Sequence, residues 1–215
     1  MGKLTRAVAL ATVLAAGAFG VQAAFGANSN VSSTSFSLFP NASFVNCMRK
    51  NASTTPTATA TVQRGAQNDT LTLKLAGFKP NLGFDLFTVQ RSNQLASGTP
   101  NPNFTTFGMA WYQSDVETNS SGAATVTVKS ILLDQIFGFD PDVSLAPTNT
   151  FHVGFWFDSV AEAQPCSPTT LAPTPFNGEH HAGPVAFITR PNSKTALGPL
   201  CTAPVKSGST FTCKP

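Results

Sequence analysis

Charged side chains are scarce in this sequence. They account for 11% of its 215 residues, whereas soluble domains usually carry about a quarter. With 13 basic and 10 acidic residues, the chain has neither a basic patch nor an acidic tail, so we expect no nucleic-acid partner. The hydrolase motif G-x-S-x-G, the dinucleotide motif G-x-G-x-x-G and the P-loop are absent too. No common enzyme class is therefore indicated.

A basic and then apolar N-terminal segment predicts export from the cell. Lys3 and Arg6 precede an uncharged run at residues 7–19, and Val21 and Ala23 supply small residues at a cleavage point. This arrangement is typical of a secretory signal peptide. An uncleaved membrane anchor is the less favoured alternative, because the run is rich in Ala and Gly and barely long enough to span a bilayer.

The rest of the chain fits one exported domain. We expect a signal peptide at residues 1–23, a polar leader at 24–35 and a single domain at 36–215. No later segment approaches a membrane-spanning length, so we expect no membrane span after cleavage and a protein that is secreted or held at the cell surface. Hydrophobic residues make up 41% of the chain and 18 residues are Phe, enough for a substantial core.

Four cysteines follow the signal segment: Cys47, Cys166, Cys201 and Cys213. An even number in an exported chain favours two disulfides. No C-x-x-C spacing supports a zinc or redox site. Of the three pairings we favour Cys47 with Cys166, which ties an early strand to a late loop, and Cys201 with Cys213.

Alternating polar and apolar residues predict a mainly β chain. Alternation begins at Phe36, and the expected strands are residues 57–64, 70–78, 84–91, 106–114, 124–128, 149–158 and 184–189. The turn residues 119–122 predict that the strands on either side form a hairpin. Residues 130–137 and 159–163 favour short helices, and residues 164–183 form a long loop. The pattern indicates an antiparallel β-sandwich or a barrel.

The segment Leu73–Leu86 resembles the strand–corner–strand of fibronectin type III and other immunoglobulin-like domains. In those domains an alternating strand ends in a leucine–x–proline corner, and a tyrosine opens the next strand. Here Phe78 stands at the leucine position before Pro80, and Phe84 lacks the tyrosine hydroxyl. The resemblance implies an immunoglobulin-like β-sandwich with Phe84 buried beneath the corner, and it implies no activity.

Two groups of residues suggest metal binding. His152 lies in an expected strand, and His180 and His181 lie in the long loop; together they could bind copper or zinc. The alternative is that the loop histidines are ordinary polar loop residues. Acidic residues in and just after the expected helix at 130–137 could bind calcium or merely shape a turn around Pro141: Asp134, Asp140 and Asp142.

Aromatic residues suggest a sugar-binding surface. Neighbouring strand residues face opposite sides, so if one of Trp111 and Tyr112 is in the core, the other should be exposed. Trp156 lies in an apolar strand and is expected in the core, and Trp111 could be there too. Glu179, with the two histidines that follow it, makes the long loop a second candidate ligand site.

Three functions remain open at this point. The leading one is a non-catalytic, structural or adhesive extracellular module. The first alternative is a carbohydrate-binding domain, and the second is a secreted enzyme that depends on copper or zinc. The expected partners are an extracellular glycan or another surface protein.

Overall fold

Antiparallel strands dominate the chain in a computed structural model. It describes residues 33–65, 68–129, 138–140, 144–174, 181–201, 204–207 and 210–213. The predicted signal peptide, the expected helix at 130–137 and the loop residues 175–180 lie outside these ranges. Among the described residues, no helix has the length and apolar character needed to cross a membrane.

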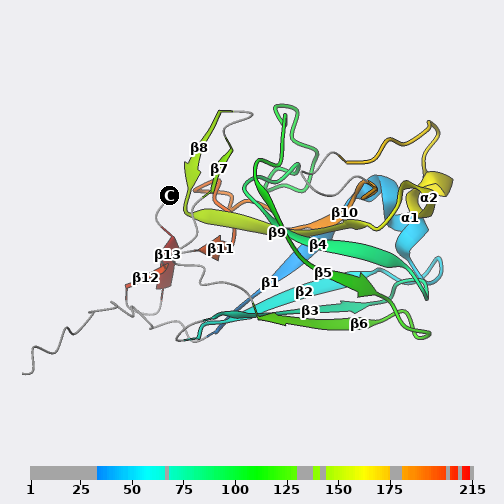
Figure 1. Cartoon of the computed structure of the whole chain (residues 1–215), viewed down its shortest axis with the longest axis horizontal. Helices are drawn as coiled ribbons and strands as arrows, with labels where there is room; N and C mark the ends of the chain where they lie inside the picture. Colours follow the sequence, from blue (N-terminus) through cyan, green and yellow to red (C-terminus); the bar gives the residue numbers. More distant parts are fainter. Residues whose placement is uncertain are drawn as a thin grey trace, which may run out of the picture.

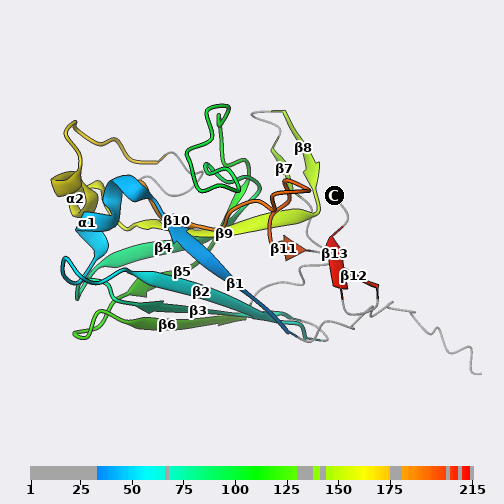
Figure 2. The ribbon, with the colours of Figure 1, turned by 180° about the vertical axis from the view of Figure 1, so that it is seen from behind.

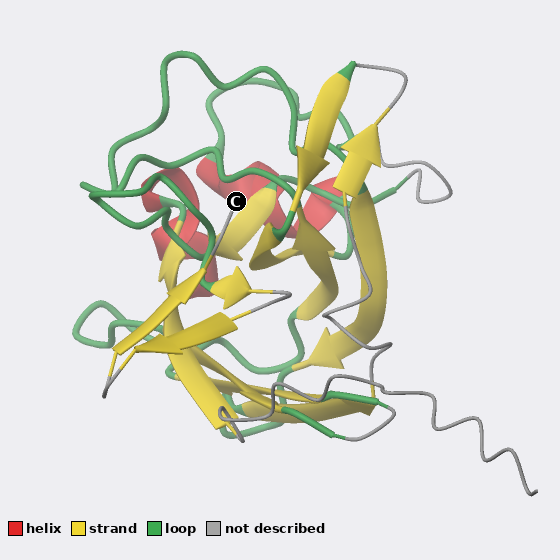
Figure 3. Cartoon of the chain, turned by 90° about the vertical axis from the view of Figure 1, so that its left-hand side faces the viewer, coloured by secondary structure: helices red, strands yellow, loops and turns green. Residues whose placement is uncertain are grey.

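Eight strands form one nearly closed sheet (Figure 3). Their order in the sheet is β5-β4-β9-β10-β1-β2-β3-β6, and every neighbouring pair is antiparallel. Their bounds are β1 (Ser33–Pro40), β2 (Thr57–Gln63), β3 (Thr70–Ala76), β4 (Gly83–Val89), β5 (Ala110–Glu117), β6 (Ala124–Lys129), β9 (Thr150–Phe157) and β10 (Val185–Ile188). The predicted mainly β, antiparallel character is confirmed.

Shorter strands lie beside this sheet. β11 (Leu200–Cys201) pairs with β9, and two small hairpins are formed by β7 (Gly138–Asp140) with β8 (Leu145–Thr148) and by β12 (Pro204–Ser207) with β13 (Thr210–Cys213). Figure 1 shows both hairpins near one end of the molecule.

β1 joins the two halves of the sheet. It pairs with β2 from Ser33 to Leu38, and its last residues, Phe39 and Pro40, pair with β10. Figures 1 and 2 show it running from the half that contains β2, β3 and β6 to the half that contains β4, β5 and β9. β1 begins at Ser33, three residues before the alternation was expected to start.

A cluster of phenylalanine rings fills the inner face of β4, β9 and β10. Phe84, Phe155 and Phe187 are almost fully buried and in ring contact, with centroids 5.0 Å apart for the first pair and 5.2 Å for the second. Phe78 from the corner packs at 5.7 Å from Phe84. The predicted burial of Phe84 beneath the corner is confirmed.

Thr118 supplies a hydroxyl at this corner. Its Oγ1 donates to the carbonyl of Lys79 at 2.7 Å and accepts the N–H of Leu82 at 2.9 Å, and the residue is fully buried. Nearby, the N–H of Phe78 bonds the carbonyl of Gly122. A Cβ at Gly122 would overlap the Phe78 carbonyl, so the close approach requires glycine there. Thr118, which follows the last residue of β5, thus bonds residues on both sides of the corner.

The turn at residues 119–122 does not close a hairpin, and that prediction is wrong. β5 pairs with β4, whereas β6 pairs with β3, so the two strands are opposite edges of the sheet. The turn carries the chain from one half of the sheet to the other. β5 also begins at Ala110, later than the expected start at Thr106.

Short helices and a disulfide close one end of the sheet. The helical segments are η1 (Ala42–Phe44), α1 (Val45–Met48), α2 (Val160–Ala163) and η3 (Gln164–Cys166). Figures 1 and 2 place α1 and α2 at the same end, where Cys47 and Cys166 form the predicted bridge, with Cα atoms 5.9 Å apart. The side chains of Cys201 and Cys213 lie outside the described part, so the second bridge stays a prediction.

We expect Phe84→Ala to lower the free energy of unfolding by about 3–5 kcal/mol, because it leaves a cavity among packed rings. Chemical denaturation followed by tryptophan fluorescence measures the change. Leu95→Ala is the control: Leu95 is 39% exposed, and its truncation should cost no more than about 0.5 kcal/mol. An equally small loss for Phe84→Ala would contradict the core assignment.

Candidate functional site

Trp111 and Tyr112 face opposite sides of β5, as predicted. Trp111 lies opposite Thr88 and packs edge-on against Phe151 of the inner core, with ring centroids 5.2 Å apart. Tyr112 lies opposite Phe87 on the outer face and is 51% exposed. Of the two candidate sugar platforms, Tyr112 is the one available to a ligand.

A β-bulge at Gln113 decides which side chains accompany Tyr112. Leu86 pairs with Ser114, but the next residue, Phe87, pairs with Tyr112, so Gln113 is an extra residue in β5. Without a bulge, residues 112 and 115 would point to opposite faces. The bulge places both on the outer face, which is how bulges commonly re-aim side chains at sheet edges.

The hydroxyl of Tyr112 is fixed by this geometry. It donates a hydrogen bond of 2.6 Å to Oδ1 of Asp115. Partial burial, this bond and the charges of Asp115 and Asp85 raise the pKa of Tyr112 to about 12. The phenol is therefore protonated throughout the neutral range, with its ring held beside a carboxylate.

A hollow of about 340 Å³ adjoins Asp115. Its lining residues are Asn81, Gly83, Phe84, Asp115, Val116, Glu117 and Asp158. Asp115 and Glu117 share the outer face of β5 because they are two residues apart in a strand. Gly83 is the cross-strand partner of Glu117 and has no side chain to fill the space between the strands. The hollow lies at the low end of the size range of small-ligand sites, about 300–1,000 Å³.

Glu162 of α2 bonds Gly83, one of the residues that line the hollow. Its Oε1 accepts the N–H of Gly83 at 2.9 Å, while the Gly83 carbonyl accepts the N–H of Asp158 at 3.1 Å. A Cβ on Gly83 would come within 3.1 Å of the Asp158 Cβ. Burial, and then the nearby charge of Asp158, raise the pKa of Glu162 above its usual value.

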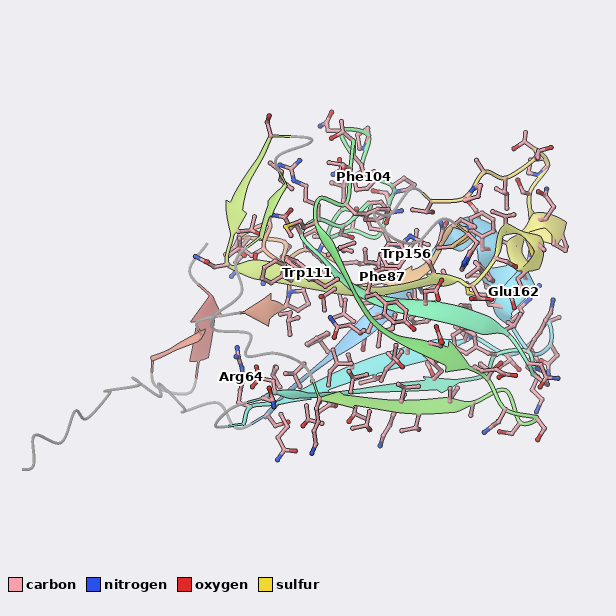
Figure 4. The ribbon with its side chains drawn as sticks, in the orientation of Figure 1. Arg64, Phe87, Phe104, Trp111, Trp156 and Glu162 are labelled. Atoms are coloured by element: carbon pink, nitrogen blue, oxygen red, sulfur yellow. A yellow bond between two sulfur atoms is a disulfide. The ribbon has the colours of Figure 1, made fainter. Side chains whose placement is uncertain are left out.

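A second cluster of aromatic rings lies on the outer face of the sheet and packs against Tyr112. Phe87 packs edge-on against Tyr112 at 5.7 Å and against Trp156 at 5.4 Å. Trp156 in turn contacts Phe107, which packs on Phe104 of the loop between β4 and β5. Figure 4 shows Phe87 and Trp156 near β4 and β9, with Phe104 in the loop above them. The ring of Tyr112 is thus backed by buried side chains.

His152 is buried in β9 rather than available to a ligand. Its Nδ1 lies 3.1 Å from the carbonyl oxygen and 2.9 Å from Oγ1 of Thr189, and the residue is 3% exposed. Burial lowers the pKa of the imidazole to about 4. Its bond to Thr189 holds β9 against the end of β10.

The other candidate metal ligands are described only in part. His181 is exposed, while His180 and Glu179 lie outside the described residues. Of the candidate calcium ligands, Asp140 is described through its backbone alone, and Asp134 and Asp142 lie outside. Within the described ranges, no three His, Cys, Asp or Glu side chains are grouped so that they could hold a metal ion.

The long loop is tied down at both of its ends. Cys166 is in the disulfide, and the N–H of Thr174 bonds the carbonyl of Ala182 at 2.8 Å. Leu171 packs against the inner core. The predicted tether through Cys166 is confirmed, and the loop's role in binding stays a prediction.

Sequence reasoning did not find the hollow. Its carboxylates come from β5 and from the residue just after β9, which are far apart in the chain. The alternation Asp115-Val116-Glu117 did carry a signal, because it places two acids on one face of a strand. Only the pairing of β4 with both β5 and β9 brings Asp158 to the same place.

Comparison with known proteins adds no relative to these observations. No protein-family model, no curated protein and no solved structure matches the chain.

We expect the stability of the protein to fall between pH 6.5 and about pH 4 because of His152. Above pH 6.5 the imidazole is neutral in both the folded and unfolded states. As the pH falls, the unfolded chain binds a proton near pH 6.5, whereas folded His152 binds one only near pH 4. This difference should cost about 3 kcal/mol across the window.

Urea denaturation at several pH values measures this slope. His152→Asn keeps an N–H donor for Thr189 but does not titrate, so its stability should change less with pH, whatever its absolute value. Equal slopes for the two proteins would show that His152 is not the group responsible.

Proposed function

We propose that the protein is a non-catalytic extracellular binding module whose ligand is a carbohydrate. One observation carries this proposal: the bulge at Gln113 sets an exposed tyrosine ring beside a hollow lined by hydrogen-bonding groups. A flat aromatic ring offers apolar contact to one face of a sugar ring. The oxygens of Asp115, Glu117 and Asn81 can bond the hydroxyls around its edge.

The rigidity of the surface supports a binding role. Tyr112 is held by its bond to Asp115 and by its contact with Phe87, so little side-chain entropy is lost when a ligand binds. The predicted signal peptide would deliver this surface outside the cell, where glycans or other surface proteins are available as partners. Export and location remain part of the proposal.

We also propose that the sheet is a sandwich of the immunoglobulin-like type. The resemblance of Leu73–Leu86 to a strand–corner–strand supports this, as does β1, which pairs with strands of both halves. Thr118 bonds across the corner, where immunoglobulin-like domains use a tyrosine hydroxyl. The relative directions of the strands in the two halves, measured in a crystal structure, test the assignment.

A glycan array and two variants test the carbohydrate proposal. Tyr112→Ala should weaken binding to any glycan found by about tenfold or more, the loss expected for an aromatic hot spot. Tyr112→Phe keeps the ring and loses only the bond to Asp115, so its binding should fall less. Isothermal titration calorimetry measures all three proteins.

Leu95→Ala is the matched control, because it also truncates an exposed apolar side chain. It should bind like the parent protein. The proposal fails if the array shows no glycan binding, or if Tyr112→Ala binds as tightly as the parent.

A further inference from the structure

The hollow beside Tyr112 is negatively charged and has no basic counterpart. Three of its lining residues carry carboxylates, and none is Lys, Arg or His. Asp115, Glu117, Asp158 and the adjoining Glu162 form no ion pair with any described residue. A ligand therefore meets carboxylates that no cation of the described chain neutralises.

So many acidic side chains in one place are unusual for a chain that contains few of them. Only ten acidic residues occur in the whole sequence, and four of them line the hollow or adjoin it: Asp115, Glu117, Asp158 and Glu162. Asp85 is buried and lies opposite Asp115 in the sheet. Asp69 pairs with Arg64 at 3.1 Å and lies far from this group, because Figure 4 places Arg64 and Glu162 at opposite ends of the molecule.

The ring of Tyr112 also favours a cationic ligand, through a separate interaction. The face of a tyrosine ring carries partial negative charge and attracts a cation. Carboxylates add charge-assisted hydrogen bonds from an ammonium group. An anionic sugar would instead meet like charge, which disfavours it.

We propose that the ligand is a cationic amino sugar, a saccharide with free ammonium groups. This inference rests on the carbohydrate function proposed above and names the chemical class that the site selects. The sugar ring lies against Tyr112, and its ammonium group lies in the hollow between Glu117 and Asp158. Neutral sugars bind the same ring more weakly because they leave these carboxylates without a cation.

Calorimetry on the full exported chain tests the selectivity. The probes are fully deacetylated glucosamine oligomers, N-acetylated oligomers of the same length, glucose oligomers and choline, each in buffer containing EDTA at a pH where the amine is protonated. The deacetylated oligomers should bind at least tenfold more tightly than either neutral series. Their affinity should fall as salt is added, because exposed charges are screened.

Charge-neutral variants identify the residues responsible. Glu117→Gln combined with Asp158→Asn should lower the affinity for deacetylated oligomers about tenfold and the affinity for neutral sugars much less, because the amides keep an oxygen for sugar hydroxyls but carry no charge. Both side chains are exposed, so the fold should tolerate the changes, and thermal unfolding checks this. Thr125→Lys is the control: it adds positive charge at an exposed position of β6, outside the site, and should not alter binding.

Each other outcome has a distinct meaning. If neutral oligomers bind as tightly as deacetylated ones in a manner dependent on Tyr112, the carbohydrate function stands and the cationic selectivity is wrong. The selectivity is also wrong if the double variant keeps full affinity. If no oligosaccharide binds, or only choline does, the carbohydrate function fails and this inference fails with it.

Discussion

Close packing of phenylalanine rings inside the curled sheet is the interaction on which the rest of the structure depends. Phe84 and Phe155 contact each other across neighbouring strands, and Phe155 and Phe187 stack nearly parallel. Phe78 joins this cluster from the corner that carries the chain into β4. Such rings bury large apolar areas, and edge-on pairs add about 0.5–1.5 kcal/mol each. These ring contacts on the inner face of the sheet therefore hold β4, β9 and β10 side by side.

β4 and β9 are also covered on their outer face, and this confines the ligand-accessible surface. Phe87 and Trp156 form a second cluster there, backed by the loop that carries Phe107. The covering stops towards the end of the sheet where β4 begins at Gly83. The candidate site lies where the two-sided burial ends.

Much of the fold could be predicted from local patterns. Alternation in TATATVQ and TLTLKLA identified β2 and β3, because successive side chains in a strand point to opposite faces. The same rule placed Trp111 and Tyr112 on opposite sides of β5. Pairing between distant strands could not be predicted in this way, and the turn at 119–122 shows why. A tight turn favours a hairpin locally, yet burial of both halves of the sheet sends β5 and β6 to different partners.

By itself, the sequence determined the β-strand content, the burial of Phe84 and the supply of cysteines, because these follow from side-chain chemistry and short-range periodicity. It also made Tyr112 a candidate. Only the tertiary structure decided what surrounds that ring. The extra residue at Gln113 is visible only against the register of β4, and Asp158 reaches the hollow only because β9 pairs with β4. Register and strand order depend on contacts between residues far apart in the chain, and no local pattern encodes them.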